Sequence, residues 1–253
     1  MKRISLITGA SKGLGRALAI AAANAMPELE ELWLLSRSIV ISEELTSACG
    51  GKSLRAICLD LCDPMSFGAL REQLSEGDVD IRLLINNAGC GYLGNVADNP
   101  AYQIANMTDL NVRALSLVTN LALPYMHNGA HIINVSSIAS FCPNPRMTVY
   151  SSTKAYVSSF SRGLHEELKP MGISVTAVCP APMATDFLAV GGIQGNSKTF
   201  ETLPYCIPEK VAAGAIRAAK KGRAFYTPRF FYKFYRFLAK IMPWSLMVKI
   251  AKT

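Results

Sequence analysis

The sequence has few of the residues from which metal sites and disulfide scaffolds are built. Its 253 residues include only three histidines and seven cysteines, and no two cysteines form a CxxC pair. The cysteines are odd in number and irregularly spaced, and several lie in apolar runs, which is typical of small buried side chains in a reducing compartment. We therefore expect neither a metal site nor a disulfide framework.

Long apolar segments are also absent. No uncharged apolar stretch has the length needed to cross a bilayer. The apolar run at residues 4–8 is too short for the core of a signal peptide, and it leads directly into a glycine-rich motif. The sequence therefore favours a cytoplasmic protein.

Acidic residues are missing from the last part of the chain. Residues 210–253 carry 11 Lys and Arg and no Asp or Glu, whereas residues 1–209 carry 15 Lys and Arg against 18 Asp and Glu. The overall charge of +8 thus combines a near-neutral body with a basic end. Such asymmetry indicates an anionic surface or partner for the basic end alone.

Short apolar runs alternate with helical patterns along most of the chain. Most of these runs are continuous, as expected for parallel strands buried on both faces. The alternation predicts an α/β fold, a single Rossmann-like doubly wound parallel sheet of about seven strands with helices on both faces. The predicted strands are residues 3–8, 32–36, 54–59, 82–86, 131–136, 173–179 and 224–227, and the clearest helical patterns are 14–25, 64–75, 101–126 and 149–169.

A glycine-rich turn follows the first predicted strand. It reads Thr8-Gly9-Ala10-Ser11-Lys12-Gly13-Leu14-Gly15, and a helical pattern begins directly after it. A phosphate can rest on the N-terminus of that helix only if the preceding turn carries no obstructing side chains. The position of the turn favours dinucleotide binding over a tight turn whose glycines serve packing alone.

Tyr150 and Lys154 lie four residues apart at the start of a predicted helix, so both side chains project from one face. A tyrosine with an unperturbed pKa of about 10 is a poor acid–base group at neutral pH. A neighbouring ammonium group stabilises the phenolate and lowers that pKa. Taken alone, the pair is equally compatible with a helix surface that has no chemical role.

Together these motifs resemble the short-chain dehydrogenase/reductase family over roughly residues 1–225. The turn has the spacing TGxxxGxG, residues 86–89 read NNAG, and Tyr150 and Lys154 match YxxxK. The resemblance implies hydride transfer between a nicotinamide and a carbonyl carbon, carried by Asn111, Ser137, Tyr150 and Lys154.

Each of these four residues has an implied role. Tyr150 would protonate the substrate oxygen, and Ser137, rather than its neighbour Ser136, would polarise it. Lys154 would also hold the nicotinamide ribose, and Asn111 would bend its helix and anchor a water chain that leads to the lysine.

The second predicted strand ends in Ser36-Arg37-Ser38, without the acid that binds the ribose 2′-hydroxyl in NAD sites. Arginine clamps a phosphate with two parallel hydrogen bonds, and Lys12 adds a second cation. We therefore expect NADP(H), the alternative being that Arg37 is only a solvated surface base. The resemblance implies cofactor contacts from Gly9, Ser11, Lys12, Gly13, Leu14, Gly15, Arg37, Asp60, Asn87, Ala88, Gly89, Tyr150, Lys154, Pro180 and Thr185.

The chain departs from the family pattern after the sixth predicted strand. The family usually has Pro-Gly there, whereas this sequence reads Pro180-Ala181-Pro182. The departure concerns the shape of the substrate mouth. The stretch 191–199, GGIQGNSKT, is rich in Gly, Ser and Asn and predicts a mobile loop.

The last segment reads RFFYKFYRFLAKIM from Arg229 to Met242. On a helix, Arg229, Lys233, Arg236 and Lys240 would form a single basic stripe among apolar positions, and residues 243–244 would break the helix. We expect an NADP-binding catalytic domain at 1–228 and a basic amphipathic extension at 229–253. The extension suits peripheral contact with a membrane, packing on the body or in a dimer, or a lid over the substrate.

These observations predict an NADP(H)-dependent oxidoreductase that interconverts a ketone and a secondary alcohol. The extension favours a hydrophobic carbonyl or alcohol substrate, such as a steroid or a 3-oxoacyl compound. The family resemblance implies a homodimer or homotetramer, and the narrow stripe argues against nucleic acid. The alternative is an NADP(H)-binding regulatory or scaffold protein without turnover, although relatives of that kind typically lack the tyrosine or lysine.

Overall fold

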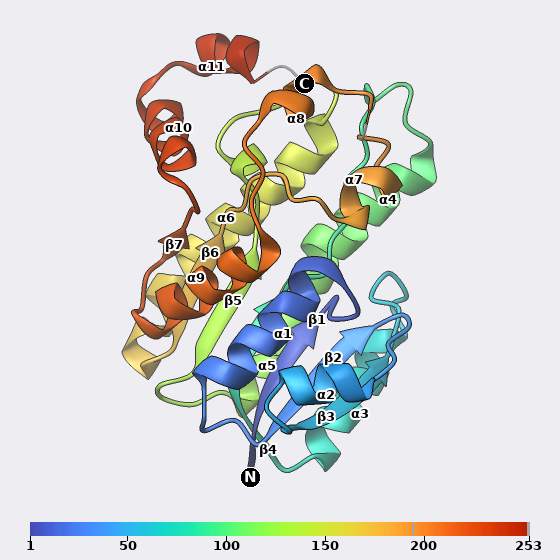
Figure 1. Ribbon diagram of the computed structural model, residues 1–253, viewed down its shortest axis with the longest axis vertical. Helices are drawn as coiled ribbons and strands as arrows, with labels where there is room; N and C mark the ends of the chain where they lie inside the picture. Colours follow the sequence, from blue (N-terminus) through green and yellow to red (C-terminus); the bar gives the residue numbers. More distant parts are fainter. Residues whose placement is uncertain (194, 252–253) are drawn as a thin grey trace.

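The computed structural model describes residues 1–193 and 195–251. A seven-stranded parallel sheet runs through the centre in the order β3-β2-β1-β4-β5-β6-β7 (Figure 1). The direction of strand addition reverses between β1 and β4, which is where α/β sheets place their ligands. The strands are β1 (Lys2–Thr8), β2 (Glu31–Ser36), β3 (Ser53–Cys58), β4 (Val79–Asn86), β5 (His131–Val135), β6 (Ser174–Val178) and β7 (Phe225–Tyr226).

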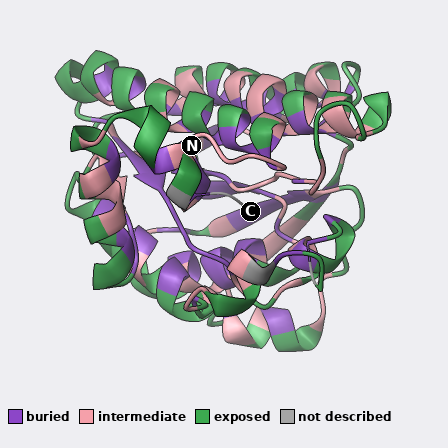
Figure 2. Cartoon of the chain, turned by 90° about the horizontal axis from the view of Figure 1, so that it is seen from above, coloured by how far each residue is buried: buried purple, intermediate pink, exposed green. Residues whose placement is uncertain are grey.

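Helices cover both faces of this sheet, and Figure 2 shows the buried strands between two helical layers. The longer helices are α1 (Gly13–Ala25), α3 (Ser66–Glu76), α4 (Ala101–Thr108), α5 (Leu115–Ala122), α6 (Thr148–Leu168), α9 (Pro208–Lys220) and α10 (Phe230–Ile241). The short ones are α2 (Glu43–Ala48), α7 (Asp186–Val190), α8 (Lys198–Thr202) and α11 (Trp244–Ile250). This arrangement confirms the predicted Rossmann-like fold.

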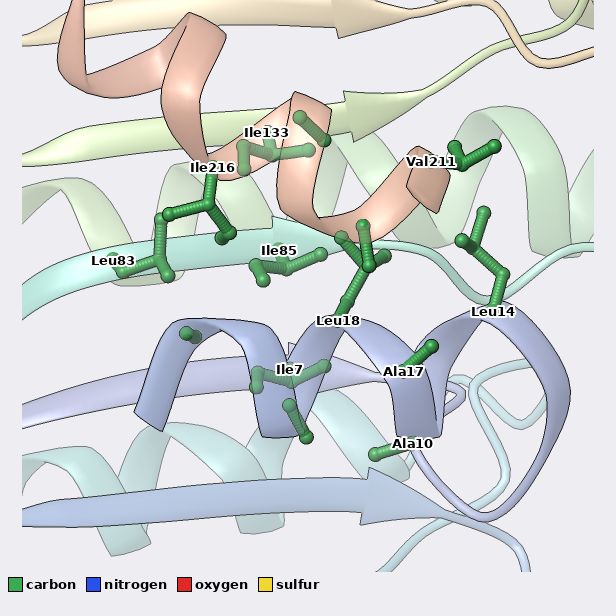
Figure 3. Packing of buried hydrophobic residues seen from close by; sticks show 14 of the residues in the cluster. Ile7, Ala10, Leu14, Ala17, Leu18, Leu83, Ile85, Ile133, Val211 and Ile216 are labelled. Atoms are coloured by element: carbon green, nitrogen blue, oxygen red, sulfur yellow. The ribbon is translucent and has the colours of Figure 1, made fainter. Parts of the chain in front are cut away.

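The core on one face is formed where α1 and α9 pack on the sheet. Leu18 of α1 and Ile216 of α9 meet Ile7, Leu83 and Ile85 of the central strands (Figure 3). The buried alanines on both helices have small side chains, so the helix backbones lie close to the strands. The other side chains of the core fill the remaining space as tightly as in a crystal. The glycine turn at the start of α1 is therefore held in a fixed position.

The long helix predicted over 101–126 is interrupted. A π-helical turn, η1 (Asp109–Ala114), separates α4 from α5, and a short 3₁₀ turn, η2 (Leu123–Tyr125), follows α5. The Asn111 side chain lies in η1 and bonds to the backbone of Cys90. Such interruptions are frequent at functional sites, and this one turns Asn111 towards the ends of the strands.

Two further predictions need correction or qualification. The helix α9 is absent from the predicted elements, although Pro208 at its start and apolar residues at helical spacing mark it in the sequence. The predicted loop 191–199 runs into α8, whose first turn is capped by the Ser197 hydroxyl accepting from the Phe200 N–H. Gln194 of that loop lies outside the described residues.

The predicted single basic stripe of the extension does not form. Arg229 precedes α10 and donates to the Tyr205 carbonyl, while the guanidinium of Arg236 lies 3.9 Å from the centre of the Phe225 ring. Only Lys233 and Lys240 of the four remain exposed on the helix. The stripe fails because a stacked position on an aromatic ring suits the planar guanidinium.

Among the described helices, none combines the length and apolar character needed to cross a bilayer. The division into 1–228 and 229–253 stays a prediction, and residues 252–253 lie outside the described part of the chain.

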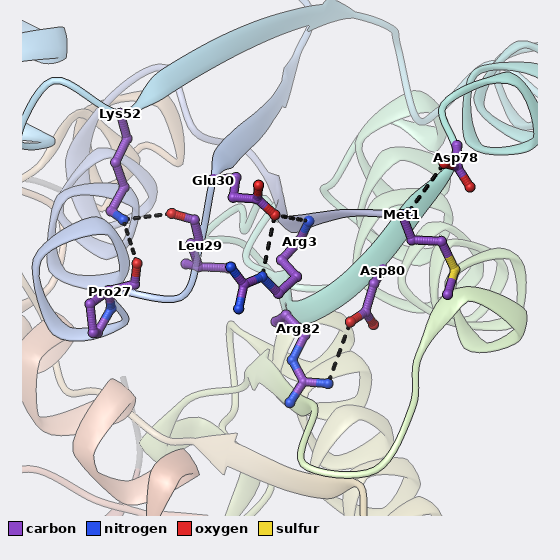
Figure 4. Close-up of polar contacts among 9 residues, drawn as sticks. All are labelled: Met1, Arg3, Pro27, Leu29, Glu30, Lys52, Asp78, Asp80 and Arg82. Carbon is purple, nitrogen blue, oxygen red and sulfur yellow. Dashed lines mark hydrogen bonds and ion pairs between the residues drawn. The ribbon is translucent and has the colours of Figure 1, made fainter.

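Polar contacts fasten the end of the molecule at which β1, β2 and β4 begin (Figure 4). The Arg3 guanidinium lies 3.3 Å from Glu30, and Lys52 donates to the carbonyl oxygens of Pro27 and Leu29. Exposed ion pairs contribute little individually. Their role is to fix the loops at this end, while the opposite edge of the sheet opens into a cleft.

Candidate active site

A cleft of about 1130 Å³ lies at the carboxyl edge of the sheet, at the switch point between β1 and β4. It runs from the glycine turn and the end of β2 to α6, α7 and α8. Every site residue predicted above except Asn111 lines this cleft. The carboxyl ends of parallel strands meet at one edge, so motifs far apart in the sequence are brought together here.

The glycine turn is shaped by positions that exclude side chains. A Cβ on Gly15 would lie 2.0 Å from the Gly9 carbonyl oxygen, and Gly9 itself has a φ of +66°. Gly13 also has a positive φ, of +55°. Within the turn Leu14 is buried, and the Ser11 hydroxyl accepts from the Ser36 hydroxyl at 3.1 Å. The turn therefore exposes backbone at the helix N-terminus, as a phosphate site requires.

The NNAG segment ties the central strands together beside that turn. The Asn87 amide donates to the carbonyl oxygens of Thr8 and Gly9, at 3.1 Å each. The backbone N–H groups of Asn87 and Ala88 both donate to the Thr8 hydroxyl. A Cβ on Gly89 would lie 3.2 Å from the Lys154 Nζ. The segment therefore leaves backbone room next to the lysine.

Ser137, Tyr150 and Lys154 are buried together at the floor of the cleft. Ser137 follows β5 and caps a short 3₁₀ turn, η3 (Ile138–Ser140), by accepting from the Ala139 N–H at 3.1 Å. Ser136 instead donates to the Lys154 carbonyl oxygen at 2.8 Å. The second serine is thus the one beside Tyr150, and the first fastens α6 to β5.

Burial dominates the proton affinities of the tyrosine and the lysine. It raises the pKa of Tyr150 to about 12, against a hydrogen-bonding effect of Ser137 that lowers it. It lowers the pKa of Lys154 to about 8. The expected lowering of the Tyr150 pKa by the ammonium is wrong for this structure. The Lys154 Nζ donates to the Val135 carbonyl oxygen at 2.9 Å and lies 5.9 Å from the centre of the tyrosine ring.

Asn111 is fully buried and uses its side chain to join two elements. Its amide nitrogen donates to the Cys90 carbonyl oxygen at 2.8 Å and to the Thr153 hydroxyl at 3.0 Å, and its amide oxygen accepts from the Cys90 N–H at 2.9 Å. It therefore clamps the loop after β4 to α6, next to Lys154.

Cations gather at the end of the cleft near β2. Lys12 lies 2.6 Å from Asp186 of α7, and Arg16 lies 3.1 Å from Glu44 of α2. Arg37 is exposed, and within the described part of the chain no carboxylate pairs with it. The Asp60 carboxylate accepts from the Cys62 N–H at 2.9 Å and lies exposed at the cleft rim. The sequence identified Lys12 and Arg37 but missed Arg16 and the two carboxylates.

The far end of the cleft is apolar. The Phe187 ring lies 5.8 Å from the Tyr150 ring, and a Cβ on Gly91 would lie 2.7 Å from that tyrosine. Met147, Leu188 and Phe200 extend this surface. Sequence reasoning missed these residues because they follow no spacing rule, although Phe187 stands two residues after the predicted contact Thr185.

The segment that departs from the family pattern lines the cleft as well. The Pro180 carbonyl oxygen accepts from the Ile138 N–H at 3.0 Å, and Ala181 is buried. Thr185 precedes α7, and its methyl group would lie 3.5 Å from a Cβ on Gly13. Thr185 therefore lies close to the glycine turn, and both Pro180 and Thr185 line the cleft. Among the described residues, no group of three His, Cys, Asp or Glu is arranged to hold a metal ion.

A family model described as short chain dehydrogenase matches residues 3–191. The chain belongs to the short-chain dehydrogenase family. A solved short-chain dehydrogenase from Sphingobium yanoikuyae in complex with NADPH superposes with a TM-score of 0.78 at 26% identity, covering 96% of this chain and 97% of that one. The family consists of oxidoreductases that bind a nicotinamide cofactor.

Two curated relatives have different substrates in their names. Sulfoacetaldehyde reductase 2 from Chromohalobacter salexigens is 33% identical over 78% of this chain and 80% of its own length. Very-long-chain 3-oxoacyl-CoA reductase from Anas platyrhynchos is 32% identical over 78% of this chain and 65% of its own length. The chain spans only 39% to 66% of the first four curated relatives that it matches. Similarity at this level therefore does not select a substrate.

Proposed function

We propose that this short-chain dehydrogenase is an NADP(H)-dependent enzyme that interconverts a ketone and a secondary alcohol, with Tyr150 as the acid and base. The observation that carries the proposal is the buried Tyr150 beside Ser137 and Lys154, in a cleft that also contains the glycine turn. A tyrosine whose pKa is raised to about 12 keeps its proton at neutral pH. It therefore carries the proton that would pass to a carbonyl oxygen during reduction.

The residues of the cleft fit a dinucleotide. At Gly9 and Gly15 a Cβ would collide with backbone, so the turn allows phosphates to approach N–H groups at the start of α1. The cleft is also lined by the other residues that the family resemblance implies for the cofactor, Asn87, Ala88, Gly89, Lys154, Pro180 and Thr185. A bound nicotinamide would supply or accept the hydride.

The side chains of this protein would orient the substrate and move its proton. Ser137 would donate a hydrogen bond to the substrate oxygen and hold it against the Tyr150 hydroxyl. Lys154, fixed by its bond to the Val135 carbonyl, would hold the ribose of the cofactor beside Tyr150. Asn111 acts as a positioning residue, since its bonds to Cys90 and Thr153 fix the surroundings of the lysine.

The choice of NADP(H) rests on the cations at the end of β2. Arg37 has no competing carboxylate among the described residues, and Lys12 and Arg16 lie in the same part of the cleft. A guanidinium pairs with a phosphate through two charged hydrogen bonds, which a 2′-hydroxyl does not offer. The apolar end formed by Met147, Phe187 and Phe200 supports a hydrophobic carbonyl substrate.

NADPH oxidation in the presence of ketones of increasing apolar size tests this proposal. Replacing Tyr150 with phenylalanine removes the proton donor and keeps the ring, so kcat is expected to fall on the order of 10³-fold. Tyr156→Phe is the matched control, because that tyrosine lies on the same helix but bonds to Ser116 outside the cleft. The control is expected to keep full activity.

The competing function is a cofactor-binding protein without turnover. Tight NADPH binding by the wild type, with no oxidation across the ketone panel, would contradict the enzyme and favour this regulatory protein. Equal rates for the wild type and Tyr150→Phe would instead contradict the role of the tyrosine.

A further inference from the structure

One face of helix α10 is buried against the body of the protein, and the opposite face is exposed to solvent. Tyr232 and Ala239 are buried against the body, and the Tyr232 hydroxyl donates to the Pro204 carbonyl oxygen at 2.8 Å. On the opposite side Phe230, Phe234, Phe237 and Ile241 recur at i, i+4, i+7 and i+11, and each is at least half exposed, from 51% to 81%. The apolar surface of this helix therefore extends well beyond what the body covers.

The exposed surface continues onto the next turn and onto α11. Phe231, Trp244 and Leu246 are also exposed, between 48% and 64%, whereas Met247 is buried. Among the described residues, every exposed phenylalanine and tryptophan belongs to this segment. We call the group the C-terminal aromatic face; it consists of Phe230, Phe231, Phe234, Phe237, Ile241, Trp244 and Leu246.

This face is held in place from behind. Arg236 stacks on Phe225 of β7, and Tyr235, on the same side of α10, lies 6.1 Å from the ring of Phe141. Ala239 and Met247 pack with Cys142, in the loop that follows the turn bearing Ser137. The exposed side chains thus belong to docked helices, and a contiguous apolar surface of this kind marks an interaction site.

Charge indicates what the face binds. Residues 210–253 contain 11 basic and no acidic residues, and Lys233, Lys240 and Lys249 are exposed on the same two helices. Lys233 and Lys240 are seven residues apart, so both lie along one edge of the C-terminal aromatic face. A second copy of the face would bring these lysines against each other, which is unfavourable. An anionic partner is complementary to them.

We propose that the C-terminal aromatic face docks the protein on the surface of an anionic lipid bilayer. Aromatic and aliphatic side chains enter the headgroup boundary, and the three lysines pair with the lipid phosphates and carboxylates. No described helix has the properties of a membrane span, which agrees with a helix lying in the plane of the surface.

The face also has a defined relation to the cleft. Figure 1 shows α10 and α11 at the same end of the molecule as α7 and α8, which border the apolar part of the cleft. Docking would therefore hold the carboxyl edge of the sheet, rather than the opposite edge fixed by Arg3 and Glu30, towards the bilayer. The proposal does not depend on turnover, because its test measures binding alone.

Trp244 provides a direct probe of docking. The protein has two tryptophans, and Trp33 is buried in the core whereas Trp244 is 64% exposed. Vesicles of phosphatidylcholine and phosphatidylserine in equal parts are expected to shift the emission of Trp244 to the blue. Vesicles of phosphatidylcholine alone are expected to cause a much smaller shift. Trp244→Phe should abolish the signal.

Variants separate the apolar and charged contributions to sedimentation with the same vesicles. The double variant Phe234→Ser/Phe237→Ser and the double variant Lys233→Glu/Lys240→Glu are each expected to weaken partition at least about tenfold. Val40→Ser/Met65→Ser is the matched control, because both residues are exposed in the segments that precede α2 and α3, far from the face in the sequence. It should partition like the wild type, and high salt should weaken all binding.

Three outcomes would overturn the proposal. The first is the absence of sedimentation and of any emission shift with anionic vesicles. The second is binding that survives in both face variants. The third is a wild-type protein that does not bind vesicles and is a dimer by analytical ultracentrifugation, whereas the Phe234→Ser/Phe237→Ser variant is a monomer. That result would assign the face to contact with a second copy. Circular dichroism spectra that match the wild type establish that each variant is folded.

Discussion

The two halves of the cleft are built in different ways. In the cofactor half, backbone defines the surface: Gly9 and Gly15 leave no room for a Cβ, and Asn87 holds the turn through main-chain carbonyls. In the substrate half, side chains such as Phe187 and Phe200 from short helices define it. The residues of the first half are therefore constrained by the conformation of the backbone, and those of the second half by the packing of side chains.

This difference determines how much of each half is visible in the sequence. A backbone that must approach a ligand requires glycine at fixed spacing, so the requirement is visible as a motif. An apolar wall can be made from any large side chain of suitable volume. The cofactor half thus identifies the family, and the substrate half carries the differences among its members.

The largest expected effect breaks the cofactor half. Gly15→Ala places a Cβ 2.0 Å from the Gly9 carbonyl oxygen, so the turn must move. We expect a loss of stability on the order of 3 kcal/mol and a fall in NADPH affinity on the order of 100-fold. Thermal unfolding and fluorescence titration measure the two quantities.

The control for this substitution is Gly163→Ala in α6. A Cβ there meets nothing within 4 Å, so the helix should be stabilised by about 0.5–1 kcal/mol with unchanged NADPH binding. If both alanine variants bound NADPH like the wild type, the turn would not be the phosphate site.

Sequence periodicity predicted the seven strands to within a few residues, because a continuous apolar run between two helical patterns is typical of a parallel strand buried on both faces. Periodicity did not predict the break at η1, although the family resemblance implied that Asn111 bends its helix. At that break Asn111 bonds to Cys90, 21 residues earlier, and such distant contacts leave no periodic signal.

The same limit applies to the site and to the extension. The positions of Ser137, Tyr150 and Lys154 followed from motif spacing, but the pKa directions depend on burial, which a motif does not contain. The prediction of a basic stripe in the extension was wrong because the Arg236 guanidinium stacks on the ring of Phe225, which belongs to β7. Helical spacing predicts neighbours on one helix and not what that helix docks against.

Cofactor preference provides the next test of the cofactor half. Arg37→Asp should reduce the NADP/NAD selectivity of kcat/KM by about 10- to 100-fold, because a charged bidentate contact is lost and a carboxylate repels the 2′-phosphate. Arg71→Asp on α3 changes the net charge equally and lies outside the cleft, so it should leave selectivity intact. An equal fall in both variants would indicate a general charge effect only.

The pH profile tests the boundary between the halves, where Lys154 lies. A lysine is charged while protonated, and a pKa lowered to about 8 means that it loses its charge above that pH, while Tyr150 keeps its proton up to about 12. The kcat/KM for reduction should therefore be flat below about pH 8 and fall about tenfold per unit above it. Lys154→Met should give a low, flat profile. A wild-type profile that is flat from pH 6 to about 10 would contradict a charged lysine in the reaction.

The smallest effect concerns the ion pair that joins the halves. Lys12 of the glycine turn lies 2.6 Å from Asp186 of α7, and both side chains are about two-thirds exposed, at 67% and 65%. Lys12 holds the pKa of that carboxyl below its usual value, yet an exposed pair contributes little to stability. For binding, the Asp186 carboxylate competes with the cofactor phosphate, because both would pair with the Lys12 ammonium group.

Asp186→Ala should therefore tighten NADPH binding by about two- to fivefold, and this gain should shrink at high salt. The gain must disappear when Lys12 is replaced by methionine, which a double-mutant cycle measures directly. A loss of affinity in Asp186→Ala would reverse the interpretation, since the pair would then be holding α7 in place over the bound cofactor. In that case α7 of the substrate half would contribute to cofactor binding. The two halves would then be built differently but would both hold the cofactor.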